Sequence, residues 1–140
     1  PSLQIDDPIM SPTLHGGGIV LSVRTCKVWK GDIVAFYYNN KILVKRVIAG
    51  PGQWVDIDGE GNVYVDGELL DEPYLGDKAL GSCNIQLPYQ VPDGRWFVMG
   101  DHRSVSVDSR DRAVGCVSEE QIVGRLTFRV WPLNRASSLQ

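Results

Sequence analysis

Apolar residues occur along most of the chain in short runs, or alternate with polar ones, at lengths that suit β-strands. The runs are rich in β-branched and aromatic residues and fall at 19–23, 33–38, 42–48, 96–99 and 126–131. Residues that favour turns separate them. The pattern predicts an all-β fold of mainly antiparallel sheets, with at most one or two short helical turns.

Local signals predict how neighbouring runs connect. Asn39-Asn40 links two β-rich runs as a hairpin turn, and Gly59-Glu60-Gly61 links 54–58 to 62–66 in the same way. Residues 118–121 (SEEQ) form a capping-box pattern that can start a helical turn. Residues 71–95 are rich in turn formers and predict a surface excursion or β-ribbon insertion within a single domain, 1–140.

The stretch 96–110 (WFVMGDHRSVSVDSR) begins as a buried strand and becomes strongly polar after Gly100. Asp108 and Arg110 are two residues apart, so on an extended segment they share a face and can form a carboxylate–guanidinium clamp. Ser106 shares that face. The alternative is a polar hairpin with local side-chain-to-backbone hydrogen bonds, and these residues alone leave both open.

Lys45 lies in an apolar run and is a candidate functional residue. It shares a strand face with Leu43 and Val47, while Arg46 shares the opposite face with aliphatic neighbours. A lysine on a strand usually points to solvent. If this face is buried, desolvation lowers the lysine pKa from its ordinary value of about 10.4. A neutral amine can then act as a general base.

Composition narrows the function classes. The chain has 140 residues, 43% of them hydrophobic, and a net charge of −3 without a long basic run, which argues against nucleic acid as a partner. No apolar segment approaches the roughly 20 residues of a membrane span. Three cysteines lie far apart, and we expect Cys26 and Cys116 to be buried thiols. Asp56 and Asp58 fit a solvated strand face, so we expect no metal and no cofactor.

Several segments, taken in order, together resemble the type I signal peptidases, which are bacterial membrane-anchored Ser/Lys endopeptidases. The matching segments are Met10-Ser11-Pro12-Thr13-Leu14, Lys30-Gly31-Asp32-Ile33-Val34, Lys45-Arg46-Val47-Ile48-Ala49-Gly50-Pro51-Gly52, Val65-Asp66-Gly67 with Glu72-Pro73-Tyr74, Val91-Pro92-Asp93-Gly94 through Arg110, and Phe128-Arg129-Val130-Trp131-Pro132. His102 stands where asparagine is usual. The matches run almost the full length of the chain.

The resemblance implies a mostly β catalytic core that removes signal peptides of exported preproteins at Ala-X-Ala-type sites. It implies a location at the cell membrane on the extracytoplasmic face, with contact to the membrane surface through an N-terminal anchor. The chain starts abruptly in strand-like sequence, so we expect the anchor to be missing from it. The implied roles are general base for Lys45, orientation of that lysine for Ser106, support for Asp101, Arg103, Asp108 and Arg110, and substrate groove for Met10 and Pro12.

The chain departs from this family at the nucleophile. The family pattern G-x-S-M-x-P-T-L places Ile9 where the serine belongs, and isoleucine has no oxygen that could attack a carbonyl. Asp7 replaces the glycine, and Pro8 removes a backbone N–H near the expected oxyanion hole. The chain is then a catalytically silent homologue, a member whose first residues were altered, or one that uses Ser11. A two-residue shift along an extended chain moves the hydroxyl by about 7 Å, which disfavours Ser11.

Three functions compete. The first is a signal peptidase that is impaired or inactive because of Ile9. The second is a non-catalytic homologue that binds extended signal-peptide-like strands by β-addition. The third is a self-cleaving repressor-type domain with Ser/Lys chemistry, which predicts an Ala-Gly cleavage site. Ala49-Gly50 is the only such dipeptide and lies within a matching segment rather than a linker, so this hypothesis is the weakest.

Overall fold

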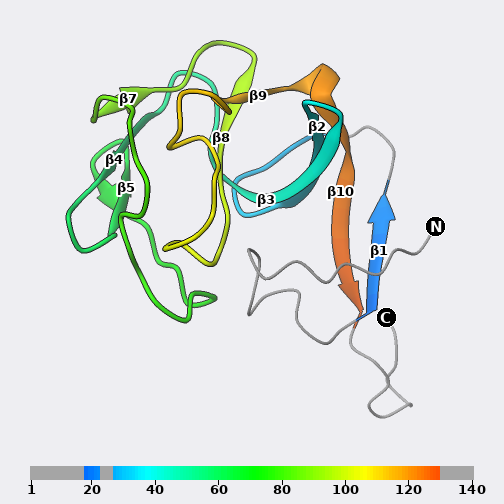
Figure 1. Cartoon of the computed structure of the whole chain (residues 1–140), viewed down its shortest axis with the longest axis horizontal. Coiled ribbons are helices and arrows are strands. Elements are labelled where there is room, and N and C mark those ends of the chain that lie inside the picture. Colours follow the sequence, from blue (N-terminus) through cyan, green and yellow to red (C-terminus); the bar gives the residue numbers. More distant parts are fainter. Residues whose placement is uncertain (1–17, 23–26, 130–140) are drawn as a thin grey trace.

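The computed structural model describes residues 18–22 and 27–129, which form two antiparallel sheets (Figure 1). The larger sheet has the strand order β1-β10-β2-β3-β8-β9, and the smaller has the order β6-β5-β4-β7. The strands are β1 (Gly18–Ser22), β2 (Ile33–Tyr38), β3 (Lys41–Ala49), β4 (Trp54–Ile57), β5 (Val63–Val65), β6 (Glu68–Leu69), β7 (Tyr89–Gln90), β8 (Arg95–Met99), β9 (Val117–Ser118) and β10 (Ile122–Arg129). The predicted all-β fold is confirmed.

The two predicted hairpins are present. Strands β2 and β3 pair in the register Tyr38↔Lys41, and both turn residues have positive φ, 48° for Asn39 and 64° for Asn40. Asparagine tolerates this left-handed conformation better than most residues, and a turn with two such residues matches the twist of the flanking strands. Strands β4 and β5 pair around Gly59–Gly61, where the Asp58 side chain accepts backbone N–H bonds within the turn.

The predicted helical turn is a single 3-10 turn, η2 (Glu119–Gln121). The backbone N–H of Ser118 donates to Gln121 Oε1 at 3.0 Å, which is the side-chain contact expected of a capping box. The turn connects β9 to β10, the strand that crosses back beside β2 and β1 (Figure 1).

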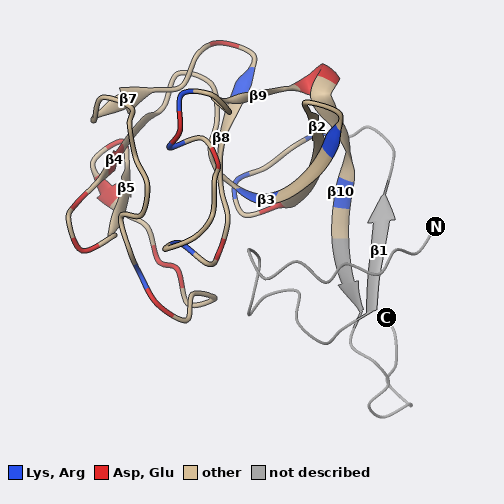
Figure 2. Cartoon of the chain, in the orientation of Figure 1, with Lys and Arg blue, Asp and Glu red and all other residues tan. Residues whose placement is uncertain are grey.

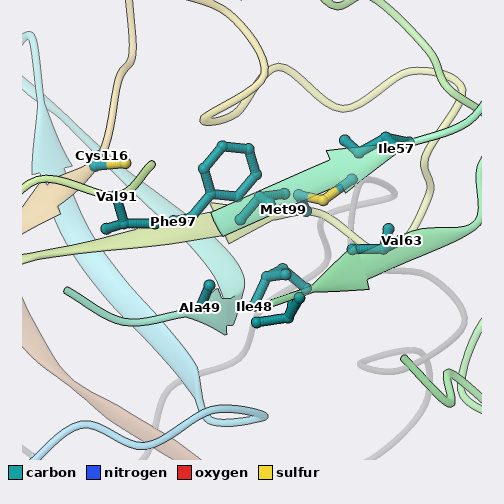
Figure 3. Close-up of a cluster of buried hydrophobic side chains, with 10 residues drawn as sticks. Ile48, Ala49, Ile57, Val63, Val91, Phe97, Met99 and Cys116 are labelled. Carbon is teal, nitrogen blue, oxygen red and sulfur yellow. The ribbon is translucent and has the colours of Figure 1, made fainter. Parts of the chain in front are cut away.

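The main hydrophobic core lies between the two sheets (Figure 3). Ile48 and Ala49 of β3 and Phe97 and Met99 of β8 pack there against valine and isoleucine side chains of β4 and β5. A second cluster lies on the opposite side of the larger sheet and contains Val34, Phe36, Val47, Val98 and Val117. Strand β3 therefore has apolar neighbours on both faces, which explains why its run of aliphatic residues is nearly continuous.

The segment 71–95 contains β7, ends at the first residue of β8 and is otherwise irregular. Most of its residues are exposed, but Glu72 and Val91 are buried at 6% and 1% exposure. Val91 belongs to the main core, whereas Glu72 contacts the polar loop that follows β8. The segment thus contacts both the hydrophobic core and the polar loop, and β7 pairs with β4.

Within 18–22 and 27–129 no helix is long and apolar enough to cross a membrane. In the same ranges, no three His, Cys, Asp or Glu side chains are grouped so that they could hold a metal ion. Cys26 and residues 1–17, which include Ile9, Met10, Ser11 and Pro12, lie outside the described residues.

The thiols of Cys83 and Cys116 provide a test of this packing. Cys116 lies in the main core, and burial raises the pKa of its thiol, so less of the reactive thiolate forms near neutral pH. Cys83 is only half-buried. We expect alkylation by iodoacetamide, followed by peptide mass spectrometry, to modify Cys116 more slowly than Cys83 in the folded protein. The two rates should converge in guanidinium, and equal rates in the folded protein would contradict the assigned core.

Candidate active site

Two neighbouring residues of β3 carry charged side chains into the protein interior. Lys45 is 2% exposed and Arg46 is 8% exposed. Because successive side chains of a strand point to opposite faces, the two enter the interior on opposite sides of the sheet. A buried charge is costly unless it is paired or hydrogen-bonded. Partners for both residues come from the loop that follows β8.

The amine of Lys45 contacts the hydroxyl of Ser106. Lys45 Nζ donates to Ser106 Oγ at 3.0 Å, and Ser106 Oγ donates to Asp108 Oδ2 at 2.8 Å. Ser106 and Asp108 are both almost completely buried. Since the hydroxyl accepts at one end and donates at the other, its orientation is fixed. We call this arrangement the Lys45–Ser106–Asp108 relay.

Asp108 is held by further donors on both of its oxygens. Arg110 Nε donates to Oδ1 at 2.8 Å and Arg110 Nη2 donates to Oδ2 at 2.9 Å, with neither side chain exposed. The backbone N–H of Gly100, at the end of β8, donates to Oδ2 at 2.9 Å. The structure thus places Asp108 and Arg110 in the bidentate geometry that their spacing allows.

Arg110 also connects the loop to the segment 71–95. Its Nη1 donates to the carbonyl oxygens of Leu80 at 2.6 Å and Arg103 at 3.0 Å, and its Nη2 donates to that of Ser106 at 3.2 Å. The chain at Gly81 passes so close that a Cβ there would overlap the Arg103 carbonyl and lie 2.5 Å from Arg110 Nη1. Gly81 also has a φ of +68°, so this approach requires glycine.

Arg46 forms the second ion pair of the site. Its Nε and Nη2 donate to the two carboxylate oxygens of Asp101 at 2.9 and 2.8 Å, and its Nη1 donates to the Gly31 carbonyl at 3.1 Å. Asp101 begins the polar loop, and Arg46 follows Lys45 in β3. The pair therefore fixes the start of the loop beside the lysine.

Arg103 forms the third ion pair, with Glu72. Its Nη2 lies 2.7 Å from Glu72 Oε2, and neither side chain is exposed. Its Nε donates to the Gly100 carbonyl at 2.7 Å. The hydroxyl of Tyr74 donates to the same Glu72 oxygen at 3.0 Å, and the Tyr74 ring lies 3.7 Å from the guanidinium carbon of Arg46. Figure 2 shows the acidic and basic segments lying next to one another along the loop between β8 and β9.

The structure brings together the predicted site residues that it describes. Four of them share one network, namely Lys45, Ser106, Asp108 and Arg110. Asp101 and Arg103 lie in the same loop but pair with Arg46 and Glu72. The expected nucleophile and groove positions, Ile9, Met10 and Pro12, lie outside the described residues.

No role is predicted from the sequence for Arg46, Glu72 or Tyr74, although all three lie in segments that resemble the signal peptidases. The available signal for Arg46 was its place beside a lysine in an otherwise apolar run. Glu72 and Tyr74 lie in a segment full of turn formers, and no periodicity marks a buried carboxylate there. Their part in the network depends on contacts with residues about 30 positions away in the chain.

The edge of β3 near Lys45 is only partly paired with β8. Strand β8 pairs with β3 between Arg46 and Ala49, so residues 41–45 lie beyond the last pair. Among the strands that the structure describes, none pairs with this stretch on that edge. A strand edge without a pairing partner is the kind of feature to which a peptide can add as a further strand.

The geometry therefore consists of a buried lysine whose amine is oriented by a serine and an aspartate, within a β-structured domain. A family model described as "Signal peptidase, peptidase S26" matches residues 2–131. The chain belongs to this signal peptidase family.

Individual relatives and a solved structure agree with this assignment. Signal peptidase IB of Staphylococcus aureus strain Mu50 is 39% identical over 145 residues, which cover 89% of this chain and 74% of the relative. Signal peptidase I of Bacillus licheniformis is 32% identical over 143 residues, covering 93% and 76%. The crystal structure of a signal peptidase I from Enterococcus faecalis V583 matches with a TM-score of 0.60 at 30% identity, covering 74% of this chain and all of that one.

The carboxylate–guanidinium pair makes a prediction about stability. Arg110→Ala leaves the buried Asp108 without its main counter-charge, so we expect a loss of about 3–5 kcal/mol in the free energy of unfolding. The measurement is denaturant unfolding followed by circular dichroism. Arg112→Ala, which removes an exposed arginine two residues further on, is the matched control and should change stability by less than about 0.5 kcal/mol. Equal effects of the two substitutions would contradict a structural role for the pair.

Proposed function

We propose that this chain is a membrane-associated serine endopeptidase of the signal peptidase I type, with Ile9 leaving it impaired or inactive. Its substrates would be signal peptides of exported preproteins, cut at Ala-X-Ala-type sites through a Ser/Lys dyad on the extracytoplasmic face of the cell membrane. Family membership supports the substrate class. The observation that carries the proposal is the buried contact between Lys45 and Ser106, which lies on β3 next to the end of its pairing with β8.

In this proposal the relay prepares Lys45 to accept a proton. In its neutral form the amine would use an N–H to bind Ser106, and this bond would fix the direction of its lone pair. A serine hydroxyl within hydrogen-bond reach of Nζ would give its proton to the lone pair as its oxygen attacks the peptide carbonyl. The ammonium then returns the proton to the leaving amine, and water repeats the cycle on the acyl-enzyme. Asp108, beyond the serine, offsets the positive charge that forms on the lysine.

Ile9 breaks this cycle at its first step. Its side chain has neither an oxygen to attack nor a proton for Lys45 to take. Pro8 removes a backbone N–H near the place where the oxyanion would be stabilised. A chain with this sequence therefore retains the base and its support and lacks the nucleophile.

A second candidate function is binding without cleavage. Ile9 and the absence of pairing between β8 and residues 41–45 of β3 favour it, because strand addition needs backbone hydrogen bonds and small side-chain subsites but no nucleophile. Such a homologue would hold signal-peptide-like strands in the same groove. The two candidates differ in whether restoring a serine restores turnover.

Restoring the nucleophile tests the proposed function. We expect a peptide with an Ala-X-Ala site to be cleaved, in detergent, by Ile9→Ser or by Ile9→Ser with Pro8→Asn, and not by the chain as it stands. Cleavage is followed by mass spectrometry of the products. Peptide binding to all three proteins, measured by fluorescence anisotropy, is the accompanying control.

Each other outcome identifies a different explanation. Cleavage by the chain with Ile9 in place would contradict the assigned register and point to Ser11. Binding by all three proteins without cleavage by any would support the binding function. Absence of both cleavage and binding would refute the peptide groove itself.

The general-base role of Lys45 is tested in the serine-restored variant. Lys45→Met keeps the length of the side chain but removes the amine, so we expect the cleavage rate to fall by about 100-fold or more. Lys41→Met replaces an exposed lysine of the same strand and should leave the rate within about twofold of the parent. Circular dichroism checks that both variants fold. Retention of most of the activity in Lys45→Met would refute the assignment.

A further inference from the structure

A short segment outside the relay contacts both of the elements that form it. Residues 72–74, which we call the 72–74 segment, include the buried carboxylate of Glu72 and the half-buried ring of Tyr74. Residue 71 before it and Pro73 within it are exposed, so Glu72 alone turns its carboxylate inward from a surface stretch. Burial of a carboxylate at such a place calls for a specific partner.

On the loop side, Glu72 acts through Arg103. The guanidinium of Arg103 binds Glu72 with Nη2 and Nη1, and binds the Gly100 carbonyl with Nε. The N–H of the same Gly100 donates to Asp108 Oδ2, the oxygen that also accepts from Ser106. Glu72 therefore holds Arg103 in place, and Arg103 is connected to the relay through Gly100, whose carbonyl accepts from Arg103 and whose N–H donates to Asp108.

On the strand side, Tyr74 acts through Arg46. Its ring lies 3.7 Å from the guanidinium carbon of Arg46, the residue that follows Lys45 in β3. Burial and the neighbouring Glu72 carboxylate raise the pKa of Tyr74 well above its usual value, so the hydroxyl stays protonated and donates to Glu72. The hydrogen bond from Tyr74 to Glu72 thus connects the residue that binds Arg103 of the loop to the residue that contacts Arg46 of β3.

We infer that Glu72 and Tyr74 are positioning residues that set the contact between the amine of Lys45 and the hydroxyl of Ser106. The inference rests on the proposed role of Lys45 as the general base. Lys45 and Ser106 come from different elements, so their distance depends on how the loop sits against β3. The 72–74 segment contacts the loop through Arg103 and β3 through Arg46. A misplacement of about 1 Å in a catalytic site can lower the rate by about 100-fold.

The test follows the protonation of Lys45 directly and does not need turnover. The chain has five lysines, and the other four (Lys27, Lys30, Lys41 and Lys78) are exposed, so they serve as internal references in NMR titrations of the labelled Cε groups. Lys45→Arg assigns the signal of Lys45. The variants are Glu72→Gln, which keeps the shape of the side chain, and Tyr74→Leu, which changes no charge.

We expect the titration midpoint of Lys45 to move toward that of the four exposed lysines by about half a pH unit or more in both variants. Tyr74→Phe keeps the ring on Arg46 and should give a smaller change than Tyr74→Leu. Glu68→Gln and Tyr37→Leu are matched controls, because they make similar changes at exposed positions and should leave the midpoint in place.

A purely structural role would lower the melting temperature and leave the Lys45 midpoint unchanged in the folded variants, and this result would overturn the inference. If Glu72→Gln does not fold, Tyr74→Leu decides, because it removes a half-buried ring and leaves the Glu72–Arg103 ion pair intact.

Turnover provides a second reading in the serine-restored background. There the Glu72 and Tyr74 variants should lower kcat by about 10- to 100-fold with KM nearly unchanged, because the inferred role of the 72–74 segment is to position Lys45 rather than to bind the peptide. An unchanged kcat in variants whose Lys45 midpoint has also stayed in place would refute the positioning role. If the serine-restored chain does not cleave, the proposed function fails while the Lys45 titration still decides this inference.

Discussion

The structure depends on the pairing of charges that lie inside the protein. Lys45, Arg46, Arg103 and Arg110 are all buried around one loop, and each binds an acceptor contributed by a distant part of the chain or by the loop itself. Burying such groups without partners would cost several kcal/mol each. The loop after β8 therefore has little freedom, since any other path would leave at least one of these charges unpaired.

The two sheets supply the frame that this network needs. The main core packs β3 and β8 against the smaller sheet. Strand β8 ends at Met99, which pairs with Arg46, so Gly100 and the loop begin next to β3. Glu72 contacts the loop from the segment that follows β6, so a part of the chain next to the smaller sheet supports the network without carrying any residue of the relay.

Much of the fold could be predicted from the sequence because its signals are local. The turn at Asn39 and Asn40 and the capping box at Ser118 depend on residues within a few positions of one another, and the structure has both. The burial of Lys45 could not be predicted, because the alternation of side chains along a strand shows which residues share a face but not whether that face is exposed. The resemblance marks Glu72-Pro73-Tyr74 as a matching segment, but the pairing of Glu72 with Arg103 could not be predicted, because the two lie 31 residues apart and no period links them.

The same energetics limit what an intact relay says about catalysis. Removing one member of a buried ion pair costs about 3–5 kcal/mol, a large part of the stability of a domain this size. Asp108, Arg110 and the residues around them would therefore be held in place by folding even in a chain that never cleaves a peptide. A nucleophile has no such structural role, so under the proposed function Ile9 would remove the chemistry and leave the scaffold. For this reason the residue at position 9, rather than the network around Lys45, decides between a peptidase and a peptide-binding homologue.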